Sequence, residues 1–210
     1  MTTAEVALIV SGLALLVSIA SLWANSLRPF KLSLLHDAPT FKLYKINPNV
    51  SGAEDGQTWW IPSFDIGISF YNTGRIPGEV LDIRIVAELA GHRSNRKFVF
   101  YPMWIVDCSR FEQDRTERFK WIKSAILRDW YPIMLGAQGE KDVHVVLESD
   151  RWDHKESGEM KLTFEVIAAG MREWSRCETY TLPISEDMFE STSSYTPYDE
   201  KIETLRKLEA

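Results

Sequence analysis

The N-terminal residues constrain this chain more than any other part of its sequence. Residues 6–27 carry no charged side chain, and most of them are strongly apolar. A run of about 18 or more such residues is long enough to cross the roughly 30 Å hydrocarbon core of a bilayer as one helix. The residues from position 28 onward have the composition of a water-soluble domain. The chain is therefore predicted to be a membrane anchor followed by a head.

Two alternatives compete with an anchor. A secretory signal peptide has a positively charged start, a shorter apolar stretch and a small residue three positions before its cleavage site. Residues 1–5 contain Glu5 but no Lys or Arg, and Leu22 stands where the small residue before cleavage after Ala24 is needed. A buried core helix would show a polar face, and residues 6–22 show none. We therefore expect an uncleaved spanning helix.

The charges beside the apolar run predict its orientation in the cell membrane. No Lys or Arg precedes the run, whereas Arg28, Lys31, Lys42 and Lys45 follow it. Positive residues close to a span favour the cytoplasmic side. We expect a single-pass protein with its N-terminus outside and its head in the cytoplasm. Arg28 and Lys31 would then lie beside anionic headgroups, and Trp23 at the depth of the membrane interface.

Small and weakly polar side chains recur along one face of the expected helix. They alternate at four- and three-residue steps and are Ala7, Ser11, Ala14, Ser18, Ser21 and Asn25. Helices in lipid associate through close packing across small residues and through hydroxyl contacts. This helix stripe predicts pairing with a second copy of the chain or with another membrane subunit. The alternative is that Ala, Ser and Gly are simply common in single spans.

Composition limits what the head can do. Roughly 180 residues remain beyond the anchor, enough for one domain with a hydrophobic core. The formal net charge of −6 argues against nucleic-acid binding, which needs a concentrated basic surface. Cys108 and Cys177 are too few for a disulfide framework. In a cytoplasmic head we expect both to be free thiols. A single disulfide between them would require the head to face an oxidising compartment.

The head alternates apolar and polar residues with a period of two, as strands with one buried face do. In the segment 81–85, for example, Leu81, Ile83 and Ile85 are expected to share the inward face. The segment 98–106 is apolar on both faces apart from Pro102. It is therefore either a strand with both faces covered by other elements or an edge strand whose pairing is interrupted at Pro102. The predicted strands are 31–36, 41–46, 64–70, 81–85, 98–106, 142–148, 159–168 and 174–182.

These strands, with turn residues between most of them, predict an antiparallel β-sandwich of the immunoglobulin-like class. A helix is expected to be inserted at residues 115–128, and a second one to begin at Thr196 with Pro197 in its first turn. No alternation of strands with helices appears, so a parallel nucleotide-binding sheet is not expected. The predicted divisions are an anchor at 1–28, a sandwich at 29–190, and a linker with a short C-terminal helix at 191–210.

A turn motif in the head carries a resemblance to a known group. The pattern F-x-N-x-G-x-x-P-G-x-V runs from Phe70 to Val80, and Leu27-Arg28-Pro29 closes the anchor. In these parts the chain resembles uncharacterised prokaryotic single-span proteins with an immunoglobulin-like β-sandwich head. The resemblance implies a fold and a membrane location. It implies no activity, and no catalytic residue follows from it.

The sequence holds no recognisable catalytic, nucleotide-binding or metal-binding motif. His36, His92, His144 and His154 are not spaced as zinc ligands, and His144 is expected to be solvated on the outward face of its strand. The densest group of ionisable residues is 150–156. Its carboxylates at Asp150, Asp153 and Glu156 could hold a hard cation, but polar hairpin loops look the same without one. No metal, cofactor or catalytic residue is predicted.

Tryptophans provide the other candidate surface. Trp59 and Trp60 are adjacent, so in an extended strand they face opposite ways and one of them is expected to face solvent or a partner. With Trp152 they form the predicted interaction surface, the alternative being that such residues belong to the core.

Three functions remain open from the sequence. The first is a membrane-tethered, non-enzymatic binding module for a ligand or protein, and it needs the fewest assumptions. The second is a sensor or effector subunit of a membrane complex that signals through packing of its spanning helix. The third is an enzyme whose acidic site is carried by loop residues such as Asp150, Asp153 and His154.

Overall fold

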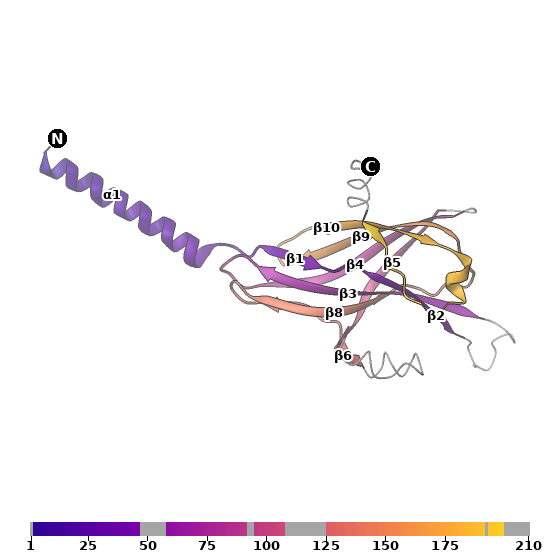
Figure 1. The fold of residues 1–210 in the computed structure, drawn as a ribbon. Helices are drawn as coiled ribbons and strands as arrows, with labels where there is room; N and C mark the ends of the chain where they lie inside the picture. Colours follow the sequence, from indigo (N-terminus) through magenta and orange to yellow (C-terminus); the bar gives the residue numbers. More distant parts are fainter. Residues whose placement is uncertain (1, 47–57, 92–94, 108–124, 192, 200–210) are drawn as a thin grey trace.

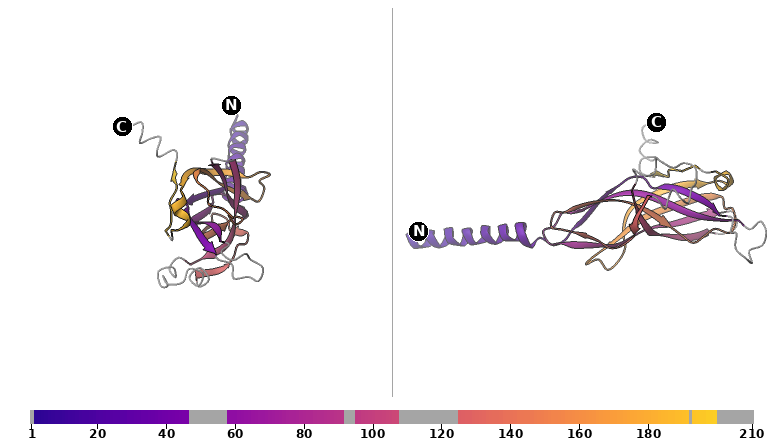
Figure 2. Two further views of the ribbon diagram at one scale, coloured as in Figure 1. Left: turned by 90° about the vertical axis from the view of Figure 1, so that its right-hand side faces the viewer. Right: turned by 90° about the horizontal axis from the view of Figure 1, so that it is seen from below.

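The computed structural model describes residues 2–46, 58–91, 95–107, 125–191 and 193–199. The chain begins with the helix α1 (Thr3–Leu22), which continues through a π-helical turn, η1 (Trp23–Leu27). The Thr2 hydroxyl accepts a hydrogen bond from the Glu5 backbone N–H, and the Glu5 carboxylate accepts one from the Thr2 N–H, so a capping box fixes the start of α1. The helix extends away from one end of an elongated β-rich head (Figures 1 and 2).

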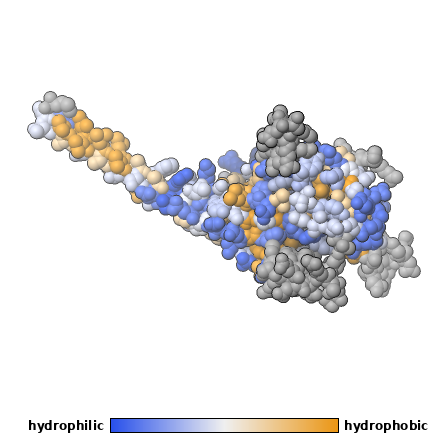
Figure 3. Space-filling view, viewed as in Figure 1, coloured by the Kyte–Doolittle hydropathy of each residue, from blue (hydrophilic) through white to orange (hydrophobic). Residues whose placement is uncertain are grey.

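No residue of α1 or η1 is buried. The segment Thr3–Leu27 is long and apolar enough to cross a membrane. Figure 3 shows the hydrophobic surface of the helix giving way to hydrophilic residues where it meets the head. A core helix of a soluble domain would be covered by other elements, so this alternative is wrong for the helix seen here.

The described part of the head is mainly β, in one antiparallel sheet of eleven strands. Their order is β1-β3-β8-β5-β4-β9-β10-β11, with β2 also pairing with β3, β6 with β5 and β7 with β4. The strands are β1 (Leu32–His36), β2 (Thr40–Ile46), β3 (Trp59–Asn72), β4 (Gly78–Gly91), β5 (Asn95–Val106), β6 (Ile126–Asp129), β7 (Ile133–Leu135), β8 (Glu140–Glu148), β9 (Gly158–Ala168), β10 (Ser175–Ile184) and β11 (Tyr198–Asp199). All eight strand segments expected from the sequence are present, whereas β6, β7 and β11 were not predicted.

The sheet curls around its own core because β5 changes partner midway. Its first half pairs with β4, up to Phe100 opposite Ile85, and its second half pairs with β8, from Tyr101 opposite Glu148. The register shifts just after Pro102, which has no N–H to donate. The expected break at Pro102 is therefore present, but β5 lies between β8 and β4 rather than at an edge of the sheet, so the edge-strand alternative is wrong. The inner faces of the two halves meet where the Phe64 and Phe100 rings pack edge to face, 4.8 Å apart.

One predicted inward residue faces outward. A β-bulge between Val80 and Asp82 inserts an extra residue into β4, so Leu81 is 38% exposed while Val80 and Ile83 are fully buried. The expectation that Leu81 shares a face with Ile83 is therefore wrong. A pattern of strict alternation cannot predict a bulge. The extra residue shifts every side chain before it to the opposite face from the one that alternation assigns.

The two predicted helices of the head are not supported. Residues 126–128 belong to β6, which pairs with β5, and residues 115–124 of the predicted inserted helix lie outside the described residues. Residues 198–199 form β11 against β10, so no helix starts at Thr196, and positions 200–210 also lie outside the described residues. Sheet pairing overrides the local helix signals here. Tyr195 already exchanges two backbone hydrogen bonds with Phe41, at 2.7 and 2.9 Å.

Candidate functional site

A groove of about 470 Å³ opens on the outer face of β3 and β8. Its polar lining is made of carboxylates, imidazoles and a hydroxyl, from Asp37, Asp107, Asp142, His36, His144 and Ser69. Its apolar lining includes Leu35 and Leu127, which are 67% and 55% exposed. Exposed leucines and carboxylates around one hollow form a candidate binding surface.

Gly67 forms the floor of this groove. It pairs with His144 across β3 and β8, and its carbonyl accepts a hydrogen bond from the Asp37 N–H at 3.0 Å. A Cβ at position 67 would lie 2.8 Å from Asp37 Oδ2 and 3.6 Å from His144 Nδ1. The missing side chain is what lets the Asp37 carboxylate lie over the strand, beside the imidazole of His144.

The row of charges continues past His144. Its Nε2 lies 3.7 Å from Asp65 Oδ1, and the other oxygen of Asp65 accepts a hydrogen bond from Lys42 Nζ. Burial opposes ionisation of Asp65, but the contact with His144 and the interaction with Lys42 outweigh it and lower the pKa of that carboxyl. The expectation of a solvated His144 is therefore wrong, because its side chain is only 26% exposed and paired.

His36 closes the groove from the interior side. Its Nδ1 lies 3.0 Å from the Asp37 carbonyl and 3.3 Å from the Tyr180 hydroxyl, and its ring packs edge-on against Phe164 at 4.9 Å. Burial, with the nearby carboxylates of Glu178, Asp199 and Asp37, raises the pKa of Tyr180. His36 thus joins the edge strand β1 to β9 and β10 and holds the Asp37 turn in place.

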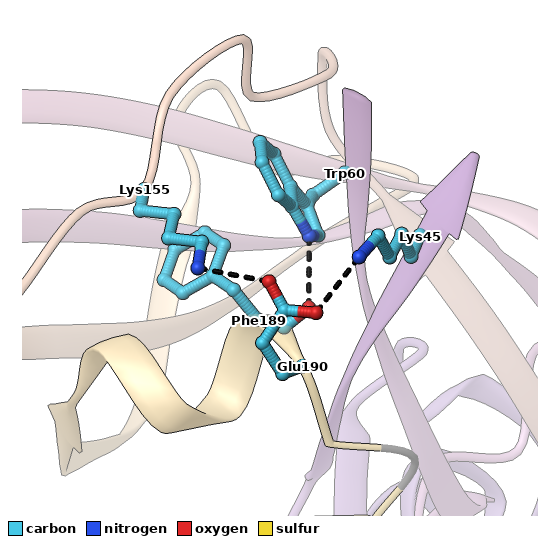
Figure 4. Close-up of polar contacts among 5 residues, drawn as sticks. All are labelled: Lys45, Trp60, Lys155, Phe189 and Glu190. Carbon is cyan, nitrogen blue, oxygen red and sulfur yellow. Dashed lines mark hydrogen bonds and ion pairs between the residues drawn. The ribbon is translucent and has the colours of Figure 1, made fainter. Parts of the chain in front are cut away.

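A second polar cluster is drawn in Figure 4, and it lies beside β2 at the end of the head opposite α1 (Figure 1). Glu190, which follows the 3-10 helix η3 (Glu186–Phe189), accepts hydrogen bonds from Lys45 at 2.7 Å and Lys155 at 2.8 Å. The two lysines lower the pKa of Glu190 to about 2. The indole N–H of Trp60 donates to the Phe189 carbonyl at 3.0 Å. These contacts fasten η3 across the end of β2 and β3.

The structure places two of the three candidate tryptophans inside the head. Trp60 is 7% exposed and Trp152 is fully buried, and their backbones pair through hydrogen bonds of 3.0 and 2.7 Å. The loop that carries Trp152 folds back over the end of the core, so neither residue forms part of an exposed surface. Trp59 is half-buried under the guanidinium of Arg151, 3.9 Å above its ring. Its role in an interaction surface stays a prediction.

The acidic residues of the 150–156 loop do not converge. Asp153 pairs with Arg151 at 3.1 Å, and Glu156 pairs with Arg96 on β5. Among the residues that the structure describes, no three His, Cys, Asp or Glu side chains are arranged to hold a metal ion. Because these carboxylates are paired with separate arginines, their arrangement does not support the hypothesis of an acidic catalytic site in this loop.

The helix stripe runs along α1 and η1, where no residue is buried. Two of its polar groups are bonded within the helix, Ser18 Oγ to the Ala14 carbonyl at 2.8 Å and Asn25 Nδ2 to Ser21 Oγ at 3.1 Å. Ala7 and Ser11 lie on the same helix, and the role of the stripe stays a prediction.

Of the two cysteines, Cys177 is a free thiol. Burial, together with the carboxylates of Glu165 and Glu178, raises the pKa of this thiol to about 11. Cys108 lies outside the described residues.

The turn motif has a structural role that the sequence did not reveal. Asn72 is 2% exposed, and both the oxygen and the nitrogen of its side-chain amide form hydrogen bonds. Its Oδ1 accepts from the Gly74 N–H at 2.8 Å, and its Nδ2 donates to the carbonyls of Ile76 and Gly136 at 2.9 and 2.8 Å. Asn72 therefore ties the 72–78 loop to the loop after β7.

The 72–78 loop is also hydrogen-bonded to residues 28–31, the segment that follows the anchor. The Arg28 carbonyl accepts hydrogen bonds from the backbone N–H groups of Arg75 and Ile76, at 2.8 and 3.1 Å. The Lys31 carbonyl accepts one from the Thr73 N–H at 2.9 Å. We call this contact between residues 28–31 and 72–78 the anchor clamp. Because of it, the head joins α1 through docked backbone rather than through a free linker.

Comparisons with known proteins add no function. No protein-family model matches the chain, and no curated protein matches it. The chain is similar to the crystal structure of a protein described as ApaA from Bordetella pertussis, with a TM-score of 0.29 and 10% identity over 83% of this chain and 98% of that one. It is also similar to an X-ray structure of a Northeast Structural Genomics Consortium target, with a TM-score of 0.28 and 9% identity over 76% and 88% of the two chains. At these TM-scores neither similarity bears on fold or function.

Proposed function

We propose that this protein is a membrane-tethered, non-enzymatic binding module. In this proposal α1 spans the membrane, with its N-terminus outside and the head in the cytoplasm, and the groove over Gly67 takes the ligand. The observation that carries the proposal is the groove itself, because a glycine keeps its floor open and three carboxylates, Asp37, Asp107 and Asp142, line it. The finer assignment of the curled sheet to the immunoglobulin-like class is part of the same proposal, supported by the two inner faces that enclose one core.

The lining indicates the chemistry of the ligand. The described residues around the groove include three carboxylates and two imidazoles but neither Lys nor Arg. Carboxylates bind ammonium and guanidinium groups through charge-assisted hydrogen bonds, and the exposed Leu35 and Leu127 suit the methylene stem of such a group. The ligand class that fits is a cationic group on an apolar stem, such as a Lys or Arg side chain of a peptide or a polyamine.

Thermal unfolding of the full-length protein in detergent tests this assignment. Spermidine and a hexalysine peptide are expected to raise Tm, and a hexaglutamate peptide is not. The variant Gly67→Ala places a methyl group against the Asp37 carboxylate and should abolish the rise in Tm. Gly136→Ala is the matched control, because a Cβ there meets nothing within 4 Å. A rise in Tm that Gly67→Ala leaves intact would place the ligand elsewhere.

A sensor or effector role is the second candidate, and the anchor clamp favours it. Since backbone hydrogen bonds join the head to residues 28–31, a displacement of the 72–78 loop would be transmitted to α1. The helix stripe would then be the contact that changes. Disulfide crosslinking with single cysteines along α1 should peak at Ala7, Ser11, Ala14, Ser18 and Ser21. A flat profile across the helix would remove this candidate.

A further inference from the structure

The end of the head nearest α1 combines exposed apolar side chains with an excess of cationic residues. Four segments meet there: 28–31, 72–78, 136–139 and 169–174. Backbone hydrogen bonds hold them together, from Gln138 N–H to the Gly74 carbonyl at 3.0 Å and from Ala169 N–H to the Glu79 carbonyl at 2.8 Å. Figures 1 and 2 show α1 leaving the head at this end. We call the surface formed by these four segments and β7 the anchor-side face.

Apolar side chains project from the anchor-side face. Met134 on β7 is 65% exposed, Ile76 in the clamp loop 43%, and Met171 after β9 38%. The backbone at each is held in place. The Ile76 N–H donates to the Arg28 carbonyl, the Met171 N–H donates to the Ala168 carbonyl at 3.0 Å, and Met134 lies between the buried Ile133 and Leu135. The three apolar groups are therefore held outward by a fixed backbone.

The segments that form the anchor-side face are rich in positive charge. The four segments contain Arg28, Lys31, Arg75 and Arg172 against one carboxylate, Glu173, although the whole chain carries a net charge of −6. A second carboxylate, Glu79, is adjacent to Met134 across β4 and β7. Cations around exposed apolar residues match an anionic bilayer surface, where Lys and Arg meet phosphates and apolar side chains enter the headgroup region.

The clamp fixes how far this face can stand from the membrane. Only Arg28 to Phe30 separate η1 from the first head residue of the clamp, Lys31, and the Arg28 carbonyl is already bonded to the 72–78 loop. A membrane that contains α1 therefore brings its surface next to Ile76. No free linker is present in the described chain to let the head move away.

We propose that the anchor-side face rests on an anionic lipid leaflet, with Ile76, Met134 and Met171 at headgroup depth and the four cations on lipid phosphates. This inference rests on the proposed function, since it requires α1 to span the same membrane. It adds a lipid-contacting surface on the head and a fixed orientation of the groove above the membrane.

Photocrosslinking in nanodiscs tests the inference with the full-length protein. A benzophenone amino acid replaces Met134, or Val10 within α1, or Asp153 at the opposite end of the head. In nanodiscs that contain phosphatidylglycerol, the probes at Val10 and Met134 are expected to capture lipid and the probe at Asp153 is not. In pure phosphatidylcholine the cations lose their anionic partners and the head can tilt away from the leaflet about residues 28–30, so capture at Met134 should fall about tenfold while capture at Val10 stays constant.

Charge variants complete the test. Arg28→Gln, Lys31→Gln and Arg172→Gln together should cause the same loss at Met134 in anionic nanodiscs. The control, Lys97→Gln with Lys161→Gln, removes two cations from the strands at the far end and should cause none. Lipid capture at Val10 with no more capture at Met134 than at Asp153 would overturn the inference and leave the tether intact. A Val10 probe that captures no lipid would overturn the tether and the inference with it.

Discussion

The carbonyl oxygen of Pro29 lies directly against Gly74. A Cβ built at position 74 would be 2.0 Å from that oxygen, and one built at Gly78 would be 2.2 Å from the ring of Phe30. The turn motif therefore has glycines where the chain leaving the anchor crosses it. This contact makes the junction between helix and head a packed interface.

Gly74→Ala should weaken the anchor clamp. The new methyl group collides with a backbone carbonyl, which cannot rotate away as a flexible side chain would, so we expect a loss of about 1–3 kcal/mol in the free energy of unfolding. In thermal unfolding this corresponds to about 2–4 °C of Tm for each kcal/mol. Gly136→Ala, in the loop next to the clamp, meets no atom within 4 Å and should leave Tm unchanged. Equal Tm values for the two variants would show that the clamp does not form.

Asn72→Ala should also destabilise the head. It leaves the Gly74 N–H and the carbonyls of Ile76 and Gly136 without their buried partner, at a cost of about 1–3 kcal/mol. Asn72→Asp should be at least as harmful, because a carboxylate would face two carbonyl oxygens. Urea unfolding of both variants measures the loss, and an aspartate variant as stable as the wild type would contradict the hydrogen-bond assignment.

The two classes of tryptophan should respond differently to truncation. Trp152 is fully buried among Phe41, Phe98 and Phe189, so Trp152→Ala should cost about 3–5 kcal/mol through the cavity it leaves. Trp59 is half-buried under Arg151, so Trp59→Ala should cost about 1 kcal/mol. Chemical unfolding of both variants checks the order, and a larger loss for Trp59→Ala would contradict the burial described above.

Glu148 should make stability fall as the pH rises. Burial raises the pKa of this carboxyl from 4.5 to about 7 in the folded protein. Between these values the folded state binds more protons than the unfolded state, so the free energy of unfolding decreases from pH 5 to pH 8. Because the side chain is partly exposed, we expect the change to be on the order of 1–3 kcal/mol.

Unfolding of Glu148→Gln at both pH values measures this contribution, because the variant should lose less stability than the wild type on going to pH 8. Glu159→Gln, at an exposed position of β9, is the control and should follow the wild type. Parallel pH profiles for Glu148→Gln and the wild type would contradict the assignment.

Local patterning predicted the strands well and their irregularities poorly. The period of two located β3, β8 and β9, because β3 and β9 bury one face along most of their length and β8 does so from Val143 to Leu147. The bulge at Leu81 and the strand nature of residues 126–128 depend on pairing with distant strands. The helical spacing within 115–128 carries no information about that pairing.

The candidate groove could not be predicted from the sequence for a similar reason. Asp37, Gly67 and His144 lie on three different segments and meet only when β3 pairs with β8 and the β1–β2 turn folds over β3. Trp60 and Trp152 are a second example, because no pattern in the sequence indicates that their segments pair backbone to backbone. The turn motif was visible in the sequence, but its partner, residues 28–31, belongs to the end of the anchor.

Alkaline carbonate extraction of membranes that contain the full-length protein tests the central claim most directly. The account predicts that the intact chain stays in the membrane pellet, and that Leu13→Lys with Leu16→Lys moves it to the supernatant by placing charge in the span. Wild-type protein in the supernatant, or a shorter chain that has lost the residues of α1, would contradict it.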